Sequence, residues 1–264
     1  MTMKQPLISI ITVNYNGTEF TCQFLESLKL VNYPHLEVIV VDNASKKDPT
    51  AALKAINPDV IVILSKENLG FAGGNNLGLK VAKGDYYFLV NNDTELTPSV
   101  FDGLLAVFDT YPDAGMCSPK FRYFFFPDTV EYAGYEDVDL LGKNGMIGCR
   151  TPEQGQYDYI TKTHYAHGAG MFVKAEVVKK VGLMPEMYFL YYEELDWCEQ
   201  IKRAGYSIYY TYQSLVFHKE SMSTGKASTL KTYYHNRNRE LLMRRKRNGW
   251  KYLIFISYYI LITV

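Results

Sequence analysis

The stretch Tyr86-Tyr87-Phe88-Leu89-Val90-Asn91-Asn92-Asp93-Thr94 passes from apolar and aromatic residues directly into two amides and a carboxylate. The apolar part predicts a buried strand, Tyr86–Val90, so the polar part lies at the end of that strand. Amide and carboxylate oxygens at the edge of a sheet are suited to a divalent cation, which can hold a diphosphate. The alternative is an ordinary turn in which Asn and Asp side chains cap their own backbone.

Three further apolar runs precede this stretch and alternate with segments that suit helices. The expected strands are Leu7–Val13, Leu36–Val41 and Val60–Leu64. The expected helices are Glu19–Lys29, Thr50–Ile56 and Gly74–Ala82. This alternation predicts parallel βαβ units and an α/β fold, beginning with one half of a doubly wound sheet. Such sheets bind ligands beyond the carboxyl ends of their strands.

Polar residues follow all four predicted strands. They are Asn14-Tyr15-Asn16-Gly17, Asp42-Asn43-Ala44-Ser45, Asn68-Leu69-Gly70-Phe71 and Asn91-Asn92-Asp93. Each segment on its own is typical of a turn or of a helix N-cap. Because all four fall at the ligand-binding edge of the sheet, together they predict a single site. The nearby glycines form neither the dinucleotide-binding nor the P-loop fingerprint.

The composition is that of an ordinary globular protein. The chain has 264 residues, of which 47% are hydrophobic and 21% charged, enough for one large domain or one domain with an extension. The formal net charge is zero, but seven basic residues and one acidic residue lie between His235 and Lys251. The four cysteines are far apart, which argues against a zinc site or a disulfide framework. The apolar run Leu7–Val13 is too short for a signal peptide and predicts the first strand of a cytosolic protein.

Five segments together resemble, in their order along the chain, the family 2 glycosyltransferases, and in particular bacterial rhamnosyltransferase-like members. They are Ile10-Ile11-Thr12-Val13-Asn14-Tyr15-Asn16, Val40-Val41-Asp42-Asn43-Ala44-Ser45, Asn68-Leu69-Gly70-Phe71-Ala72-Gly73-Gly74-Asn75-Asn76, Asn91-Asn92-Asp93-Thr94 and Phe189-Leu190-Tyr191-Tyr192-Glu193-Glu194-Leu195-Asp196. The resemblance implies a GT-A fold over residues 1–225, with a Rossmann-like mixed sheet flanked by helices. Residues 226–264 then form a helical extension.

The resemblance also implies a function. It implies an inverting transfer of a sugar from a nucleoside diphosphate sugar, with dTDP-rhamnose as the first choice of donor. The acceptor is then a glycan or a lipid-linked glycan in surface polysaccharide synthesis. Two alternatives remain open: a sugar nucleotidyltransferase, for which the expected activation loop is missing, and a non-catalytic nucleotide- or glycan-binding module.

The resemblance assigns the donor site residue by residue. The residues that match nucleotide-contacting positions are Thr12, Asn14, Asn16, Asp42, Asn68, Gly70, Gly73, Asn75 and Asn92, and Arg237 matches a position that can neutralise the diphosphate. Asp93 matches the last carboxylate of the family's D-x-D-type motif, and Asn91 stands where many members carry the first aspartate. With His218, these residues are the predicted ligands of Mg²⁺ or Mn²⁺. A lone histidine after an aromatic strand is otherwise a packed residue.

Three carboxylates are candidates for the base that deprotonates the acceptor: Glu193, Glu194 and Asp196. Relatives carry Glu-Asp where this chain has Glu193-Glu194, and Glu194 takes the place of the residue regarded as the base. The alternative is that these carboxylates form the acidic first turn of a helix, which the helix dipole favours. Both interpretations are compatible, because a helix start fixes the carboxylates in place.

The C-terminal segment joins a basic cluster to an apolar run. Arg244-Arg245-Lys246-Arg247 leads through Trp250 into Tyr252–Val264. That run is shorter than the ~20 residues needed to cross a bilayer. It predicts peripheral attachment of residues 244–264 to the inner face of the cell membrane. The alternative is a helix that packs back on the domain or into a homodimer. No nucleic-acid-binding motif accompanies the arginines.

Overall fold

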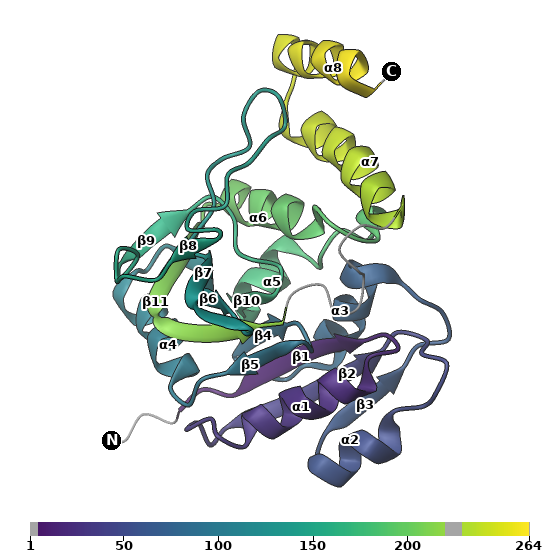
Figure 1. The fold of residues 1–264 in the computed structure, drawn as a ribbon, viewed down its shortest axis with the longest axis vertical. Coiled ribbons are helices and arrows are strands. Elements are labelled where there is room, and N and C mark those ends of the chain that lie inside the picture. Colours follow the sequence, from purple (N-terminus) through teal and green to yellow (C-terminus); the bar gives the residue numbers. More distant parts are fainter. Residues whose placement is uncertain (1–4, 220–228, 264) are drawn as a thin grey trace.

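The computed structural model describes residues 5–219 and 229–263. A mixed sheet forms the centre of the molecule, helices cover both of its faces, and two C-terminal helices lie together at one end (Figure 1). The predicted Rossmann-like mixed sheet is therefore confirmed. The boundary that the sequence places between residues 225 and 226 lies outside the described residues.

The N-terminal half of the sheet is parallel, as the sequence predicts. Its strands are β1 (Ile8–Asn14), β2 (Leu36–Asp42), β3 (Ile61–Leu64) and β4 (Tyr86–Val90), and each lies within one residue of its expected bounds. They are arranged in the order β3-β2-β1-β4, and their register places Asn14 beside Asp42. The strand order reverses at β1, so a crevice for a ligand is expected beyond the ends of β1 and β4.

The remaining strands extend the sheet from β4 and make it mixed. They are β5 (Thr94–Leu96), β6 (Ala114–Tyr123), β7 (Phe126–Tyr132), β8 (Thr151–Pro152), β9 (Ile160–Thr163), β10 (Gly170–Lys174) and β11 (Ser207–His218). Strand β10 runs antiparallel to β4, and β11 runs parallel to β6 and antiparallel to β5. This arrangement brings the end of β11 beside the segment that follows β4.

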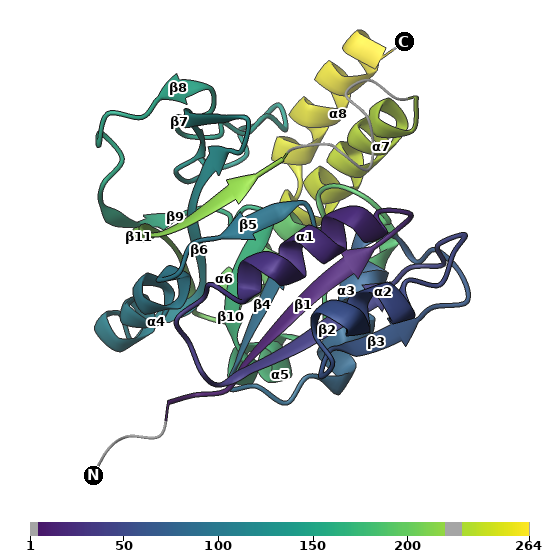
Figure 2. The ribbon, with the colours of Figure 1, turned by 60° about the horizontal axis from the view of Figure 1, so that its bottom comes forward.

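Helices cover the two faces of the sheet with separate cores (Figure 2). One face carries α1 (Thr18–Leu28), α2 (Thr50–Ile56) and α4 (Val100–Thr110). The other carries α3 (Gly70–Val81), α5 (Ala175–Val181) and α6 (Glu193–Arg203). Strand β1 supplies both cores, because Ile8 and Ile10 point to the first face and Ile11 points to the second. Full burial of each such side chain contributes roughly 1.5–3 kcal/mol.

Helix α3 begins at Gly70, four residues before the expected start at Gly74. The expectation that residues 70–73 form a loop is therefore wrong. The sequence suggests a loop because of its glycines, but these glycines serve close packing. A Cβ atom at Gly78 would lie 2.4 Å from Ile11 Cγ2, and one at Gly74 would lie 3.0 Å from Val13. Gly70 has a φ of 72° and turns the chain into the helix.

The C-terminal extension consists of α7 (Thr229–Lys246) and α8 (Trp250–Thr263). Leu242 and Met243 of α7 and Phe255 of α8 are buried in the second core, which also contains Trp197 of α6. Helix α7 therefore packs back on the domain, which is the alternative that the sequence left open for this segment. Among the described residues, no helix is both long and apolar enough to cross a membrane.

Candidate functional site

A chain of hydrogen bonds joins the ends of β1, β2 and β4. The side-chain amide of Asn92 donates to Oγ1 of Thr21 at 2.8 Å, and that hydroxyl donates to Oδ1 of Asn14 at 2.9 Å. Nδ2 of Asn14 in turn donates to Oδ1 of Asp42 at 2.7 Å. Three of the four strand ends that the sequence predicts to converge are thus fixed relative to one another by buried polar groups, which are favourable only when they are paired.

The loops after β1 and β2 are joined as well. The backbone N–H of Asn16 donates to Oγ of Ser45 at 2.7 Å, and the backbone N–H of Lys46 donates to Oδ1 of Asn16 at 2.9 Å. Thr12 is fully buried on β1, and its Oγ1 atom has no hydrogen-bond partner within residues 5–219 and 229–263. The assignment of Thr12 and Asn16 to nucleotide contacts stays a prediction.

Asn43, which the sequence does not single out as a site residue, connects the end of β2 to the start of α3. Its Nδ2 atom donates to Oδ1 of Asn68 at 3.0 Å and to the carbonyl of Gly70 at 2.9 Å. Gly73 and Asn75 lie inside α3 rather than in a loop, and Asn75 is buried with its amide bonded to the Phe71 carbonyl. The donor-side segment is therefore the first turns of a helix.

Asp93 and His218 meet at the crevice beside β4. Nε2 of His218 lies 3.2 Å from Oδ1 of Asp93, and Nδ1 of His218 lies 2.8 Å from Oε1 of Glu131. All three side chains are buried. Burial lowers the pKa of His218, but the charges of Glu131 and Asp93 outweigh it and raise the pKa to about 10. Glu131 lies on β7 and carries no sequence signal, because only tertiary contact reveals it.

The segment from His167 to Gly170 contacts the end of β4, the ring of His218 and the candidate base. The backbone N–H of Asn91 donates to the carbonyl of Ala169 at 3.1 Å. A Cβ atom at Gly168 would lie 3.6 Å from Cγ of Glu194. Burial lowers the pKa of His167 to about 3, so its imidazole is neutral. The described parts of the chain hold no cluster of three or more His, Cys, Asp or Glu side chains suited to a metal ion.

The structure distinguishes the three candidate carboxylates at the start of α6. Glu193 is buried, and burial together with the charge of Glu194 holds its pKa well above the usual range. Asp196 is buried and bonded to the Tyr188 hydroxyl at 2.8 Å and to Arg245. Glu194 is only partly covered, and burial raises its pKa to about 7. Of the three, Glu194 is the carboxylate that is partly exposed, and its assignment as the base stays a prediction.

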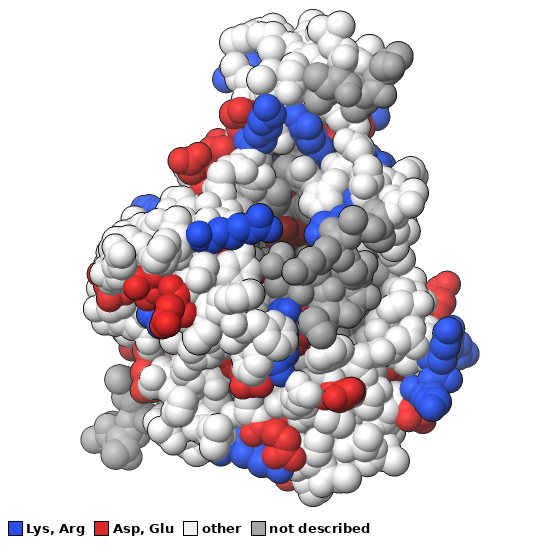
Figure 3. All heavy atoms as spheres, viewed as in Figure 1, with Lys and Arg blue, Asp and Glu red and all other residues white. Residues whose placement is uncertain are grey.

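Arg237 lies on α7 and faces the turn before α6. Its Nη1 atom donates to the carbonyl of Met187 at 3.0 Å and to Oδ1 of Asn238 at 2.8 Å. Its predicted contact with the diphosphate stays a prediction. Figure 3 shows a hollow below α8 and beside α7, with Lys and Arg side chains around it and Asp and Glu side chains among them.

Known proteins resemble this chain in sequence. A family model described as glycosyl transferase family 2 matches residues 9–182. The N-acetylglucosaminyl-diphospho-decaprenol L-rhamnosyltransferase of Mycobacterium tuberculosis strain H37Rv is 23% identical over 267 residues, covering 92% of this chain and 86% of the relative. The low-salt glycan biosynthesis hexosyltransferase Agl10 of Haloferax volcanii is 24% identical over 209 residues, covering 76% of this chain and 63% of the relative.

Solved structures share the fold. The mannosyltransferase PcManGT from Pyrobaculum calidifontis, in complex with GDP-Man and Mn²⁺, has a TM-score of 0.68 at 16% identity, covering 99% of this chain and 71% of its own. GalNAc-T7 with UDP, GalNAc and Mn²⁺ has a TM-score of 0.66 at 16% identity, covering 86% of this chain and 47% of its own. The predicted GT-A fold is confirmed. With more than half of its length matched by the family model, this chain belongs to glycosyl transferase family 2.

Proposed function

We propose that this chain transfers a sugar from a nucleoside diphosphate sugar to a hydroxyl of a lipid-linked glycan, with inversion at the anomeric carbon. One observation carries the proposal. Glu194 lies close to Gly168, and in the same segment the ring centroid of His167 lies 5.9 Å from that of His218, which pairs with Asp93. A base close to a pair that can hold a cation on the donor diphosphate is what a single displacement requires.

The donor nucleotide is assigned to the crevice formed by the ends of β1, β2 and β4. Asp42 is buried, and its two oxygens accept from the Asn14 side chain and from the backbone N–H of Ser45. These two bonds fix the orientation of the carboxylate, which we assign to the base or ribose of the donor. Among donors, dTDP-rhamnose is the first candidate, because the Mycobacterium tuberculosis relative is named a rhamnosyltransferase.

Asp93 and His218 offer two protein ligands to a divalent cation, Mg²⁺ or Mn²⁺, which would take the place of the Nε2 proton that the raised pKa of His218 retains in its absence. A histidine that binds a metal characteristically donates its other ring N–H to a carboxylate. Glu131 accepts from Nδ1 of His218 in this way and directs Nε2 toward Asp93. Asp93 and His218 would hold the cation, with Asn91 beside them, and the donor diphosphate and water would complete its oxygen ligands. When bound, the cation offsets the negative charge of the departing diphosphate.

Glu194 acts as the base. Its carboxylate accepts the proton of the acceptor hydroxyl while that oxygen bonds to the anomeric carbon of the donor. The bond from that carbon to the diphosphate oxygen breaks in the same displacement, so the product has the opposite anomeric configuration. Glu193 stays protonated beside it, because burial and the charge of Glu194 both disfavour its ionised form.

The acceptor and the membrane are linked through α8. The Mycobacterium tuberculosis relative is named for a decaprenol-linked substrate. Helix α8 exposes apolar side chains at helical spacing, namely Trp250, Leu253, Ile254, Ile260 and Leu261. We place this face in the interface of the inner leaflet, where lipid-linked glycans for surface polysaccharides are assembled.

A donor screen tests the proposal. The purified chain is heated with dTDP, UDP, GDP, ADP or CMP, with and without Mn²⁺, because a ligand of the native state raises Tm. A Mn²⁺-dependent rise with one diphosphate is expected, followed by transfer from the matching sugar nucleotide with inverted configuration in the product. Nucleotide binding without turnover would instead favour a non-catalytic module. No shift with any nucleotide would refute the donor site.

A further inference from the structure

The turn that leads into α6 has an unfavourable backbone. Phe189, Tyr191 and Tyr192 have φ values of 67°, 68° and 75°. Residues with a Cβ atom rarely adopt this left-handed conformation, and it persists only where the surroundings impose it. Glu194 follows in the first turn of α6. Its position therefore depends on what holds the turn.

The side chain of Asn238 on α7 holds it. Nδ2 of this residue lies within hydrogen-bond distance of three backbone carbonyl oxygens: 2.9 Å for Tyr188, 2.7 Å for Leu190 and 2.8 Å for Tyr191. Its Oδ1 atom accepts from Arg237 at 2.8 Å, which orients the amide with its NH₂ group toward the turn. Asn238 is fully buried, so no water replaces these bonds when they are lost.

Other contacts hold the turn between α3 and α7. The backbone N–H of Phe71 on α3 donates to the carbonyl of Phe189 at 2.7 Å. From α7, the ring of His235 stacks on Tyr191 with centroids 4.2 Å apart, and the ring of Tyr234 stacks on Phe189 at 5.1 Å. Asn238 is the α7 residue that bonds the backbone of the turn on both sides of Phe189.

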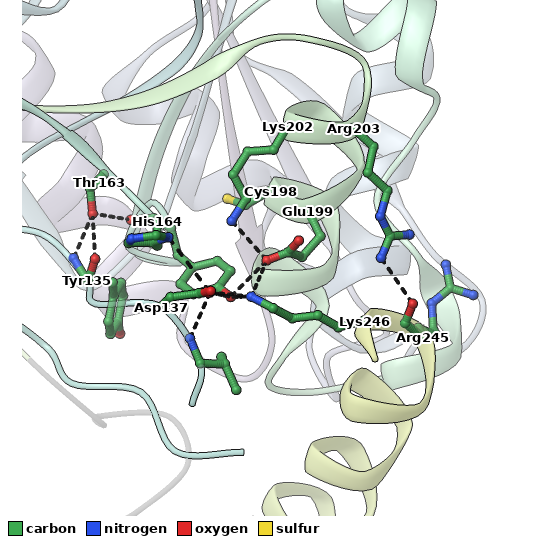
Figure 4. Close-up of polar contacts among 12 residues, drawn as sticks. Tyr135, Asp137, Thr163, His164, Cys198, Glu199, Lys202, Arg203, Arg245 and Lys246 are labelled. Atoms are coloured by element: carbon green, nitrogen blue, oxygen red, sulfur yellow. Dashed lines mark hydrogen bonds and ion pairs between the residues drawn. The ribbon is translucent and has the colours of Figure 1, made fainter. Parts of the chain in front are cut away.

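Helix α7 is itself anchored at its other end. The ammonium group of Lys246 is buried against Asp137, the Tyr165 hydroxyl and Glu199, with 2.7 Å to Oε1 of Glu199 (Figure 4). Arg245, one residue earlier, is ion-paired with the buried Asp196 of α6. The helix that carries Asn238 is therefore fixed to α6 and to the loop after β7, and it can act as a rigid support.

We propose that Asn238 is a positioning residue for sugar transfer, which holds the turn 188–192 so that α6 presents Glu194 to the acceptor. This inference rests on the proposed function, because the position of Glu194 affects the rate of transfer only if Glu194 is the base. It assigns the C-terminal extension a part in the reaction that is separate from any contact with a membrane.

The test compares three variants of the full chain. Asn238→Asp keeps the size of the side chain but has no N–H donor and turns carboxylate oxygens toward carbonyl oxygens. Asn238→Ala removes the amide without adding charge. If the aspartate variant does not fold, the alanine variant still tests whether the amide holds the turn. Asn236→Ala is the matched control, because Asn236 is exposed on the same helix and its side-chain amide bonds to the Thr232 carbonyl, within the helix itself.

Two readouts separate positioning from general destabilisation. For the Asn238 variants, kcat is expected to fall by about 10- to 100-fold, while Kd for the donor nucleotide stays within about twofold of the parent value. Amide hydrogen exchange is expected to become faster in residues 187–196 and to stay unchanged in β1. The Asn236→Ala chain should match the parent in both measurements.

Each contrary result has a distinct meaning. Exchange that is unchanged in residues 187–196 overturns the role of Asn238 in holding the turn. Faster exchange with an unchanged kcat overturns its role in positioning Glu194. A parent chain that binds nucleotide but transfers no sugar overturns the proposed function itself, and with it the catalytic part of this inference.

Discussion

Nε2 of His218 lies 3.2 Å from Oδ1 of Asp93, although the two residues are 125 positions apart in the sequence. If this pair holds the cation, Asp93→Asn and His218→Gln should each weaken Mn²⁺ binding by about tenfold or more, because each removes one protein ligand. Titration followed by Mn²⁺ electron paramagnetic resonance, with the nucleotide selected in the donor screen present, measures this directly. Asp102→Asn, at an exposed position of α4, is the control. Unchanged affinity in both variants would place the cation elsewhere.

Glu131 orients His218 through the Nδ1 atom, on the side of the ring away from Asp93. Glu131→Gln should therefore weaken Mn²⁺ affinity without removing a ligand. Loss of such an outer partner costs about 10- to 100-fold in metal affinity or activity. The same titration measures the change. Asp128→Asn, exposed on the same strand, should leave the affinity unaltered. A glutamine variant that binds Mn²⁺ as well as the parent would show that Glu131 is only a packing partner.

Glu194→Gln should reduce kcat by about 10²- to 10⁴-fold, the contribution typical of a positioned base. Glu176→Gln, in the first turn of α5, is the matched control. Glu194→Asp should retain part of the activity, because the resemblance implies an aspartate at this position in most members of the family and the carboxylate moves by only about one bond length. Steady-state kinetics with saturating donor distinguishes these variants. Full activity in Glu194→Gln would remove the residue from the mechanism.

The pH dependence of the parent enzyme follows from the same carboxylate. A base works in its deprotonated form, and burial raises the pKa of Glu194 to about 7. The titratable groups on which its charge acts are Glu193, Tyr135, Tyr192 and Cys198. Activity should therefore rise with pH up to about 7 and level off above it. A profile of kcat/KM against pH that is already flat at pH 5 would contradict the assignment.

Lys246→Met should destabilise the protein, because it leaves Glu199 and Asp137 without their buried cation. Breaking one partner of a buried ion pair costs roughly 3–5 kcal/mol, and partial exposure of Asp137 reduces the expected loss to roughly 2–4 kcal/mol. Urea unfolding gives the free energy of unfolding directly. Lys251→Met, at an exposed position of α8, should change it little.

The same variant has a pH signature. Burial raises the pKa of Asp137, but hydrogen bonds and the Lys246 charge outweigh it and lower the pKa from 3.8 to about 2. A carboxylate whose pKa is lower in the folded state than in the unfolded state stabilises the protein when the pH is above its pKa in the unfolded state. This stabilisation is lost as the pH falls through its pKa in the folded state. The difference in stability between the parent and Lys246→Met should therefore shrink between pH 4 and pH 2. A difference that is constant over that window would show that Asp137 does not contribute through its charge.

Leu253→Ser combined with Ile254→Ser should weaken binding to lipid vesicles, because burial of apolar side chains drives interfacial attachment. Arg245, Lys246 and Arg247 bond inward, to Asp196, to Glu199 and to the carbonyl of Val138. Binding should therefore depend less on anionic lipid than the basic cluster suggests. Co-sedimentation with phosphatidylcholine and phosphatidylglycerol vesicles measures both effects. A parent chain that stays in the supernatant with both lipids would refute attachment through α8.

The sequence by itself determined the parallel strands, the polar residues at their ends and the family. These features are local, because strand formation follows the apolar run, and the residue after a strand necessarily lies at an edge of the sheet. The resemblance of five short segments then predicted the GT-A fold, which the structural neighbours confirm.

Only the tertiary structure decided which side chains act together. Glu131 meets His218 because β7 and β11 both pair with β6, and Asn238 meets the turn before α6 because α7 folds back on the domain. The basic cluster is local in sequence, yet most of its charge is paired with carboxylates from α6 and from the loop after β7. A side chain's type can be read from the sequence, but its partner depends on packing between segments that are distant along the chain.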